Sequence, residues 1–195
     1  MSGAQTRLEE ISLIERARSG DQSAFGELVA RYQVAVYNLC YRMLGQSQDA
    51  EDAAQEVFLR VYRQLGSYNP AHRFSTWVLS IASHFCIDQL RKRRLTIVPI
   101  ESIVEWARSR GPGPEDEAAS GEARDEMQAL LGRLPEKYRL ALVLRYWHDL
   151  SYLEIAEVMK LPENTVKTRL HRARQMLEGL LKDQELKRDV VSRTA

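Results

Sequence analysis

Residues 161–175, "LPENTVKTRLHRARQ", combine positive charge with closely spaced hydrogen-bond donors. Lysine and arginine side chains neutralise DNA phosphates, and Arg, Gln or Thr side chains near a helix N-terminus read base edges in the major groove. At about 100° per residue, one side of a helix would carry the apolar residues Val166, Leu170, Ala173, Leu177 and Leu181. The opposite side would carry only donors: Lys167, Thr168, His171, Arg172, Arg174 and Gln175.

An ordinary solvated helix face is the alternative explanation for this cationic side. Such faces usually alternate in sign and form ion pairs four residues apart, and here we expect no acidic partner before Glu178. The pattern therefore favours contact with nucleic acid. The first turn, 163–165, also offers free backbone N–H groups to a phosphate.

The residues before this stretch predict the element that positions it. Ser151 and Glu154 form a Ser-x-x-Glu capping box that begins a helix of about nine residues. Ala156, Lys160 and Val166 then have the offsets of a helix-turn-helix: a small residue where the helices cross, a turn, and a β-branched core residue. Glycine takes a left-handed turn without a Cβ clash, so Lys160 is a departure from the easiest choice.

A second group of charged residues lies in "DAEDAAQEVFLRVYRQL", 49–65. A helix over this range would carry an apolar face, Ala50, Ala54, Val57, Val61 and Leu65, opposite a charged face, Asp49, Asp52, Glu56, Arg60 and Arg63. The acidic residues at its N-terminus also suit the helix dipole. Spacing alone leaves a structural and a partner-binding interpretation equally supported.

Aromatic and basic residues follow in "RFSTWVLSIASHFCIDQLRKRR". Rings beside cations are what unstacked bases and their backbone require. For Trp77, packing in the core is the alternative and is the commoner role of an aromatic on an apolar face. The preceding loop, from Tyr68 to Arg73, is easier to interpret as a contact surface.

Composition excludes several other classes. The net charge of +1 conceals two mildly basic blocks, 1–95 and 127–195, around an acidic middle, 96–126. Cys40 and Cys86 lack metal-ligand spacing and are expected to be buried in a reducing compartment, with no metal and no cofactor. No segment predicts a membrane span or a signal peptide, so we expect a cytoplasmic protein. No nucleophile–base pair or Gly-rich phosphate loop points to an enzyme.

Helical periodicity recurs along the chain, which predicts an all-α fold of two small helical domains. We expect a flexible acidic linker between them, because "RGPGPEDEAASGE" is rich in Pro, Gly and acidic residues. Predicted helices in the first domain begin at the N-cap Asp21 and then cover 33–44, 49–65 and a long segment capped by Ser75 or Thr76. Those in the second domain cover 122–134, 136–149, 151–160 and 163–182.

Three motifs in this order, "DAEDAAQEVFLRVYR", "FSTWVLSIA…CIDQLRKRR" and "LSYLEIAEVM…TVKTRLHRAR", resemble bacterial RNA polymerase sigma factors of the sigma-70 family. The two-domain layout resembles the extracytoplasmic-function (ECF) subfamily. The resemblance implies a region 2 domain over 8–95, a linker over 96–124, a region 4 helix-turn-helix domain over 125–183 and a disordered tail over 184–195. It also implies a stress-responsive transcription factor.

The resemblance also implies roles for individual residues. Binding to the β′ clamp of core polymerase falls to Asp49, Asp52, Gln55, Glu56 and Arg60. Capture of the minus-ten element, including a flipped base, falls to Tyr68, Asn69, His72, Arg73, Trp77, His84 and Arg91. Recognition of the minus-thirty-five element falls to Asn164, Thr165, Lys167, Thr168, Arg169, His171, Arg172 and Arg174. His84 stands where the family usually has asparagine, and Asn164 where it often has glycine.

Further partners follow from the resemblance: the β flap of core polymerase, promoter DNA in double- and single-stranded form, and an anti-sigma factor. The linker of about 30 residues has an extended reach of about 100 Å, enough for one monomer to contact two separated promoter elements. The alternatives are a helix-turn-helix regulator that binds a palindromic operator as a dimer, and a helical adaptor whose basic helix contacts protein. The aromatic–basic segment and the acidic face of 49–65 have no role in either alternative.

Overall fold

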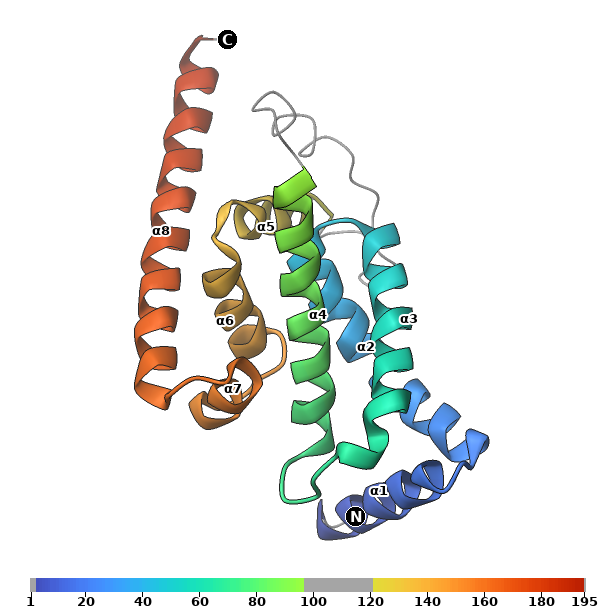
Figure 1. The fold of residues 1–195 in the computed structure, drawn as a ribbon. Helices are drawn as coiled ribbons and strands as arrows, with labels where there is room; N and C mark the ends of the chain where they lie inside the picture. Colours follow the sequence, from blue (N-terminus) through green and yellow to red (C-terminus); the bar gives the residue numbers. More distant parts are fainter. Residues whose placement is uncertain (1–2, 97–120, 195) are drawn as a thin grey trace.

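The computed structural model describes residues 3–96 and 121–194, with side chains over 7–95 and 125–184. The described part of the chain consists of helices joined by short loops, in agreement with the predicted all-α class (Figure 1), with a 3-10 turn at Leu65–Ser67 after α3. Their bounds are α1 (Gly3–Arg18), α2 (Gln22–Leu44), α3 (Ser47–Gln64), α4 (Phe74–Thr96), α5 (Gly121–Arg133), α6 (Glu136–Tyr146), α7 (Tyr152–Met159) and α8 (Glu163–Thr194).

The first domain packs α2, α3 and α4 side by side, with α1 across one end of this bundle (Figure 1). Asp21 caps α2 as predicted, since its carboxylate accepts the Ala24 N–H at 3.0 Å. Gly45 ends α2 in the left-handed conformation, with φ 89°, and its N–H donates to the Tyr41 carbonyl. Glycine suits this C-cap because it has no Cβ to clash.

Two predicted helix boundaries in this domain were wrong. The segment expected as one helix from Asp21 and another over 33–44 is a single 23-residue helix, α2. Neither Tyr32 nor Gln33 breaks a helix, so the backbone hydrogen bonds continue. Helix α4 begins at Phe74, before the expected caps Ser75 and Thr76; the Thr76 side chain is buried inside the first turn and its hydroxyl has no partner.

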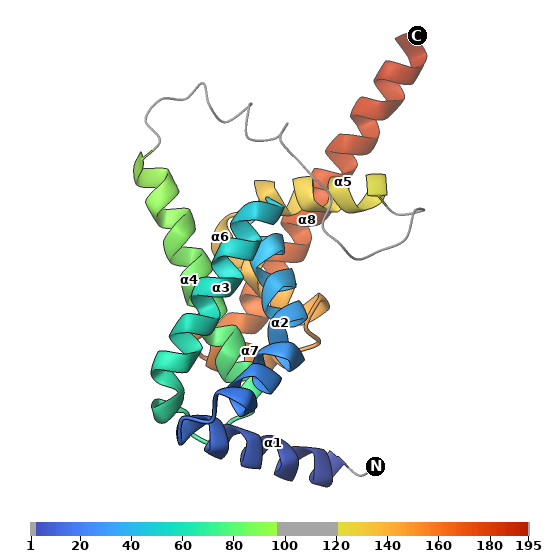
Figure 2. The same ribbon diagram turned by 90° about the vertical axis from the view of Figure 1, so that its right-hand side faces the viewer.

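The second domain contains the predicted helix-turn-helix, formed by α7 and α8. Ser151 and Glu154 make both bonds of the capping box, and Ala156 and Val166 are buried where the helices cross. Lys160 takes the left-handed turn, with φ 52°, and its N–H donates toward the Ala156 and Glu157 carbonyls. Helix α8 continues through Thr194, where a disordered tail over 184–195 was expected, and its C-terminal end projects from the body (Figure 2).

The two domains pack against each other, which the sequence did not predict. Helix α7 lies along α4, and α5 and α6 lie against α2 (Figures 1 and 2). The Arg139 side chain, 5% exposed, donates to the carbonyls of Met43 in the first domain and of Gly132 and Leu134 in its own. Most of the predicted linker, 96–124, lies outside the described residues.

Cys40 and Cys86 are fully buried between α2 and α4, as expected, with their Sγ atoms 3.7 Å apart. Within the described ranges, no group of three or more His, Cys, Asp or Glu side chains is placed so that it could hold a metal ion. No helix among the described residues is both long enough and apolar enough to cross a membrane.

Candidate nucleic-acid interface

The cationic face of α8 is exposed along the helix. Val166, Leu170 and Ala173 anchor the opposite face in the domain core, as predicted, whereas Leu181 is exposed because α8 has run past the domain. Lys167, Thr168, His171, Arg172 and Arg174 all have exposed side chains, and Asn164 precedes them in the first turn. Arg169 and Thr165 are half-buried. A broad surface of hydrogen-bond donors therefore faces away from the first domain.

One expectation about this face was wrong. Lys167 pairs with Glu163 at 2.8 Å, four residues away, so a partner for its charge precedes Glu178. Thr168 donates its hydroxyl hydrogen to the Asn164 carbonyl at 2.9 Å. The guanidiniums of Arg172 and Arg174 are exposed and form none of the ion pairs found among the described residues. These two arginines make the largest contribution to the charge that the face offers to DNA.

Helix α6 places two residues against this face that sequence reasoning missed, the exposed Lys137 and Tyr138, which is only 8% exposed. The Tyr138 hydroxyl lies beside the Arg172 guanidinium, whose hydrogen bond lowers the pKa of Tyr138. The Lys137 ammonium lies 5.0 Å from the centre of the Tyr138 ring. Both residues come from the start of α6, and their spacing along the chain gave no signal because α6 reaches α8 only through the tertiary fold.

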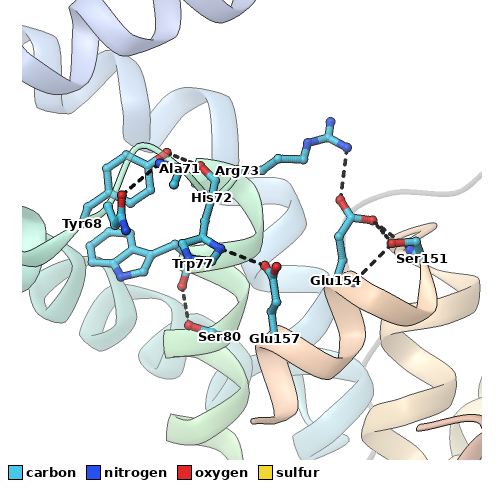
Figure 3. A network of polar contacts seen from close by, with 10 residues as sticks. Tyr68, Ala71, His72, Arg73, Trp77, Ser80, Ser151, Glu154 and Glu157 are labelled. Atoms are coloured by element: carbon cyan, nitrogen blue, oxygen red, sulfur yellow. Dashed lines mark hydrogen bonds and ion pairs between the residues drawn. The ribbon is translucent and has the colours of Figure 1, made fainter. Parts of the chain in front are cut away.

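The loop between α3 and α4 is held in one shape by local bonds. Asn69 accepts the Ala71 N–H at 3.0 Å through its side-chain oxygen, and the Tyr68 hydroxyl donates to the His72 carbonyl at 2.7 Å (Figure 3). Tyr68, expected as part of the contact surface, is instead only 6% exposed, and burial raises the pKa of its phenol. Its ring packs against Phe74 and Trp77, at 5.1 and 5.3 Å between centroids, because an apolar ring gains most by filling the space beneath the loop.

The remaining predicted minus-ten residues present polar atoms around this loop and along α4. Asn69, His72 and Arg73 have exposed side chains in the loop. Trp77 is half-buried, which supports the core role that the sequence left open. His84 and Arg91 are exposed further along α4, and the His84 Nδ1–H donates to the Ser80 carbonyl at 2.6 Å, leaving Nε2 for another partner.

Two acidic residues from the second domain contact Arg73 and His72 of the loop. The Arg73 guanidinium lies 3.2 Å from Glu154 Oε1, and His72 Nδ1 lies 3.2 Å from Glu157 Oε2 (Figure 3). Partial burial alone would raise the pKa of Glu154, but hydrogen bonds from Ser151 and the charge of Arg73 outweigh it and hold that pKa below its usual value. The Glu154 carboxylate is therefore anionic at neutral pH.

The predicted polymerase-binding residues line one groove of about 440 Å³ between α3 and α4. Asp49, Asp52, Glu56 and Arg60 form one wall, with Gln55 exposed nearby. Arg60 bonds Glu56 at 3.1 Å and lies 4.7 Å above the Phe85 ring. Arg93 of α4, which the sequence analysis did not single out, forms part of the other wall and bonds Asp49 at 2.8 Å.

Comparison with known proteins identifies the family to which this chain belongs. Residues 28–96 match the family model for Sigma-70 region 2, and residues 124–177 match that for Sigma-70, region 4. The ECF RNA polymerase sigma factor SigW of Bacillus subtilis is 39% identical over 178 residues, covering 87% of this chain and 95% of SigW. The chain belongs to the ECF sigma factors. It is thus a transcription initiation factor that directs RNA polymerase to promoters.

Other relatives of this sigma factor agree in length and fold. The ECF RNA polymerase sigma-E factor of Escherichia coli K12 is 36% identical over 181 residues, covering 89% of this chain and 94% of that protein. Among solved structures, CnrH in complex with the cytosolic domain of CnrY is 28% identical with a TM-score of 0.65, covering 88% of this chain and 96% of CnrH. The sigma factor RpoE of Bartonella quintana shares the fold at a TM-score of 0.67, covering 81% of this chain and 96% of RpoE.

Proposed function

We propose that this sigma factor is a two-point promoter reader with three separate surfaces. The α8 face docks the minus-thirty-five element as duplex in the major groove. The loop at 69–73 and the exposed side of α4 capture unpaired bases of the minus-ten element. The groove between α3 and α4 binds the β′ clamp of core polymerase.

The observation that carries this proposal is the exposed donor face of α8. Its side chains reach solvent from a helix whose other face is fixed by Val166 and Leu170 in the core. A helix anchored in this way presents its hydrogen-bond donors along one face, as recognition in the major groove requires. Arg172 and Arg174 supply charge for phosphates or guanine edges, and Lys167 exchanges the Glu163 carboxylate for a phosphate on binding.

The minus-ten surface works by differential binding. Unpaired bases stack on rings or pair with polar side chains, and that binding favours the melted duplex over the closed one. Asn69, Arg73 and His84 have exposed side chains for this purpose, although Arg73 also pairs with Glu154 and the His84 Nδ1–H bonds the Ser80 carbonyl. Because Tyr68 and Trp77 pack beneath the loop, we assign them to holding its shape.

The polymerase groove supplies charges of both signs to a partner helix. Asp52 and Gln55 are exposed at its rim, while Asp49 and Glu56 are already paired with arginines. Charged side chains at the rim of an interface influence the choice of partner and the association rate more than the affinity. On this proposal the protein carries out no covalent chemistry itself and acts in the cytoplasm with polymerase and DNA.

We also include the β flap and a regulatory protein among the partners. The family resemblance implies an anti-sigma factor, and the related CnrH was solved in complex with the cytosolic domain of CnrY.

Two variants separate the DNA and polymerase functions. Charge reversal of Asp52 and Glu56 should abolish pull-down of core polymerase while the isolated protein keeps its affinity for duplex DNA. Arg172→Ala should weaken binding to duplex DNA and leave the pull-down of core polymerase unchanged. If the reversed-charge protein still captures core enzyme normally, the groove between α3 and α4 is not the polymerase site.

A further inference from the structure

Helix α1 lies across the end of the first domain, beside the turn that leads from α3 into the minus-ten loop, residues 69–73 (Figures 1 and 2). Its apolar side chains Leu13, Ile14 and Ala17 are buried against the bundle. The match to the region 2 family model covers 28–96, so α1 precedes the matched range. Helix α1 therefore adjoins the minus-ten loop without belonging to any of the three proposed surfaces.

Two hydrogen bonds tie α1 to the elements around the loop. The Tyr32 hydroxyl of α2 donates to the Glu10 carboxylate, whose side chain is 21% exposed. The Arg18 guanidinium donates to the Gly66 carbonyl at 3.1 Å, in the short turn before the loop. Hydrogen bonds to an ionised group are stronger than those between neutral groups. Glu10 therefore holds the Tyr32 side chain in one orientation.

A row of aromatic rings connects Tyr32 with the loop. The Tyr32 ring meets Phe74 edge to face, with 5.4 Å between centroids, and Phe74 meets Tyr68 in the same way at 5.1 Å. Phe74 is 1% exposed and Tyr68 is 6% exposed. Because interiors are close-packed, a ring that moves at Tyr32 moves its neighbours. The Tyr68 hydroxyl then donates to the His72 carbonyl at 2.7 Å, which fixes the backbone of the loop (Figure 3).

Glu10 also acts on both phenols through its charge. Burial raises the pKa of Tyr68, and the negative charge of Glu10 raises it further. Burial and the hydrogen bond to Glu10 likewise raise the pKa of Tyr32. Both hydroxyls therefore stay protonated at neutral pH and remain able to donate, one to Glu10 and the other to the loop.

The polar character of the Glu10–Tyr32 contact matters because hydrogen bonds are directional and apolar contacts are not. An apolar pair at positions 10 and 32 would attach α1 to α2 without fixing how the ring at 32 turns. The hydroxyl–carboxylate bond fixes that rotation, and with it the edge that Tyr32 presents to Phe74. This contact is therefore suited to setting the geometry of the loop as well as to holding α1 in place.

We propose that α1 is a positioning element for the minus-ten loop, acting from Glu10 through Tyr32 and the rings beneath the loop. Glu10 and Tyr32 are then positioning residues, because they act through Tyr68 on the loop backbone. Capture of unpaired bases should depend on them, whereas binding of duplex DNA by α8 and of core polymerase should not. This inference rests on the assignment of the loop to the minus-ten element under the proposed function.

Hydrogen–deuterium exchange in the full-length protein, followed by NMR, measures the loop without DNA. The Ala71 N–H is bonded to the Asn69 side chain at 3.0 Å and the His72 N–H to the Asn69 carbonyl at 3.1 Å. Glu10→Ala and Tyr32→Phe should each speed the exchange of these two amides several-fold. Glu10→Gln should stay close to wild type, because its amide oxygen still accepts the Tyr32 hydroxyl.

Two control variants separate positioning from general loosening of the domain. Tyr37→Phe removes a phenol hydroxyl further along the same helix, where Tyr37 stacks on Tyr41 at 6.2 Å. Arg31→Gln removes the cation 3.7 Å from Glu10 and leaves the Tyr32 bond in place. Neither should alter exchange in the loop. Unchanged exchange in Glu10→Ala and Tyr32→Phe, or an equal rise in Tyr37→Phe, would overturn the positioning role.

Holoenzyme assembled from each variant and purified core polymerase tests the consequence for DNA. The probes come from a promoter found by mapping the start sites of the wild-type enzyme: its labelled non-template strand, and a duplex fragment that carries only the distal element. A hydrogen bond to a charged group changes an equilibrium by roughly tenfold or more. Glu10→Ala and Tyr32→Phe should therefore lower the affinity for the single strand by about tenfold, and leave the affinities for the duplex fragment and for core polymerase unchanged.

The loop's own side chains distinguish failure of this inference from failure of the proposed function. Asn69→Ala with Arg73→Ala should lower the affinity for the single strand in wild-type α1. If it does, and faster loop exchange in the α1 variants brings no loss of that affinity, the role of α1 in DNA capture is overturned. If the loop variant itself binds the single strand like wild type, the assignment of the loop fails, and the role of α1 in DNA capture fails with it.

Discussion

The Arg93 guanidinium lies 2.8 Å from the Asp49 carboxylate, which ties the end of α4 to the start of α3. Both side chains are about one-third exposed, at 34% and 30%. The first carboxylate of the polymerase groove is thus oriented by a basic residue of the helix that also carries His84 and Arg91. The pair links the surface assigned to polymerase with the helix assigned to melted DNA.

Arg93→Gln should weaken binding of core polymerase several-fold, because Asp49 loses the partner that fixes its side chain. The free energy of unfolding should change by less than about 1 kcal/mol, since the pair is partly exposed to solvent. Surface plasmon resonance with purified core enzyme measures the affinity, and chemical denaturation measures the free energy of unfolding. Arg91→Gln removes the same charge nearby on α4 and should leave core affinity intact; equal losses in both variants would assign the effect to charge alone.

Arg172→Ala should weaken binding of the protein to duplex promoter DNA by about 1–3 kcal/mol if the guanidinium reads a base edge. Core binding should not change, because Arg172 lies on the α8 face away from the groove. Arg133→Ala removes another exposed charge, at the end of α5, and serves as the control. Equal loss of duplex affinity in the control would show that Arg172 acts only through net charge.

Lys160→Gly should stabilise the protein by about 0.5–1 kcal/mol. Lys160 occupies the left-handed region, with φ 52°, where a Cβ is unfavourable and glycine is not. Lys160→Ala keeps the Cβ and should show no such gain, which separates the backbone effect from loss of charge. Thermal denaturation of the two variants measures the difference, and equal stability would show that the turn is unstrained.

Stability should fall as pH drops from about 6.5 to about 4 because of His148. Burial lowers its pKa to about 4, and its Nε2 is buried without a partner. Because the pKa of His148 is lower in the folded protein than in the unfolded chain, the unfolded chain takes up the proton at a higher pH. Lowering the pH therefore favours unfolding throughout that interval. Asp149, Arg73 and Tyr32 also line the cavity of about 290 Å³ beside His148. Of these, only the charge of Asp149 opposes the lowering of the His148 pKa.

Replacing His148 by Phe should remove up to about 3 kcal/mol of this pH dependence. Urea denaturation at several pH values between 4 and 7 compares the variant with wild type. Parallel curves for the two proteins would mean that other groups cause the acid sensitivity.

The parts of the fold that could be predicted are those set by neighbours along the chain. The Ser151–Glu154 capping box, the left-handed Lys160 and the buried Val166 all depend on residues within about one or two helical turns, where spacing determines contact. The cationic face of α8 followed from the same periodicity. Local patterns were insufficient at Tyr32–Gln33, where a helix boundary was expected and the helix continues.

Contacts between distant segments could not be predicted in this way. Arg139 and Met43 are 96 positions apart, and Glu157 and His72 are 85 apart. Nothing in either segment marks the other as its partner, because burial of a polar side chain is decided by the assembled domains. The same limit hid Arg93 beside Asp49 and Tyr138 beside Arg172.

Transcription in vitro with purified core polymerase on genomic DNA, followed by mapping of the RNA start sites, tests the two-point promoter reader most directly. The starts should share two sequence elements at a fixed separation upstream. Arg172→Ala should weaken selection of the distal element, and loss of the Asn69 and Arg73 side chains should impair opening at the proximal one. Starts that share only one element, or that ignore both sets of substitutions, would contradict the two-point assignment.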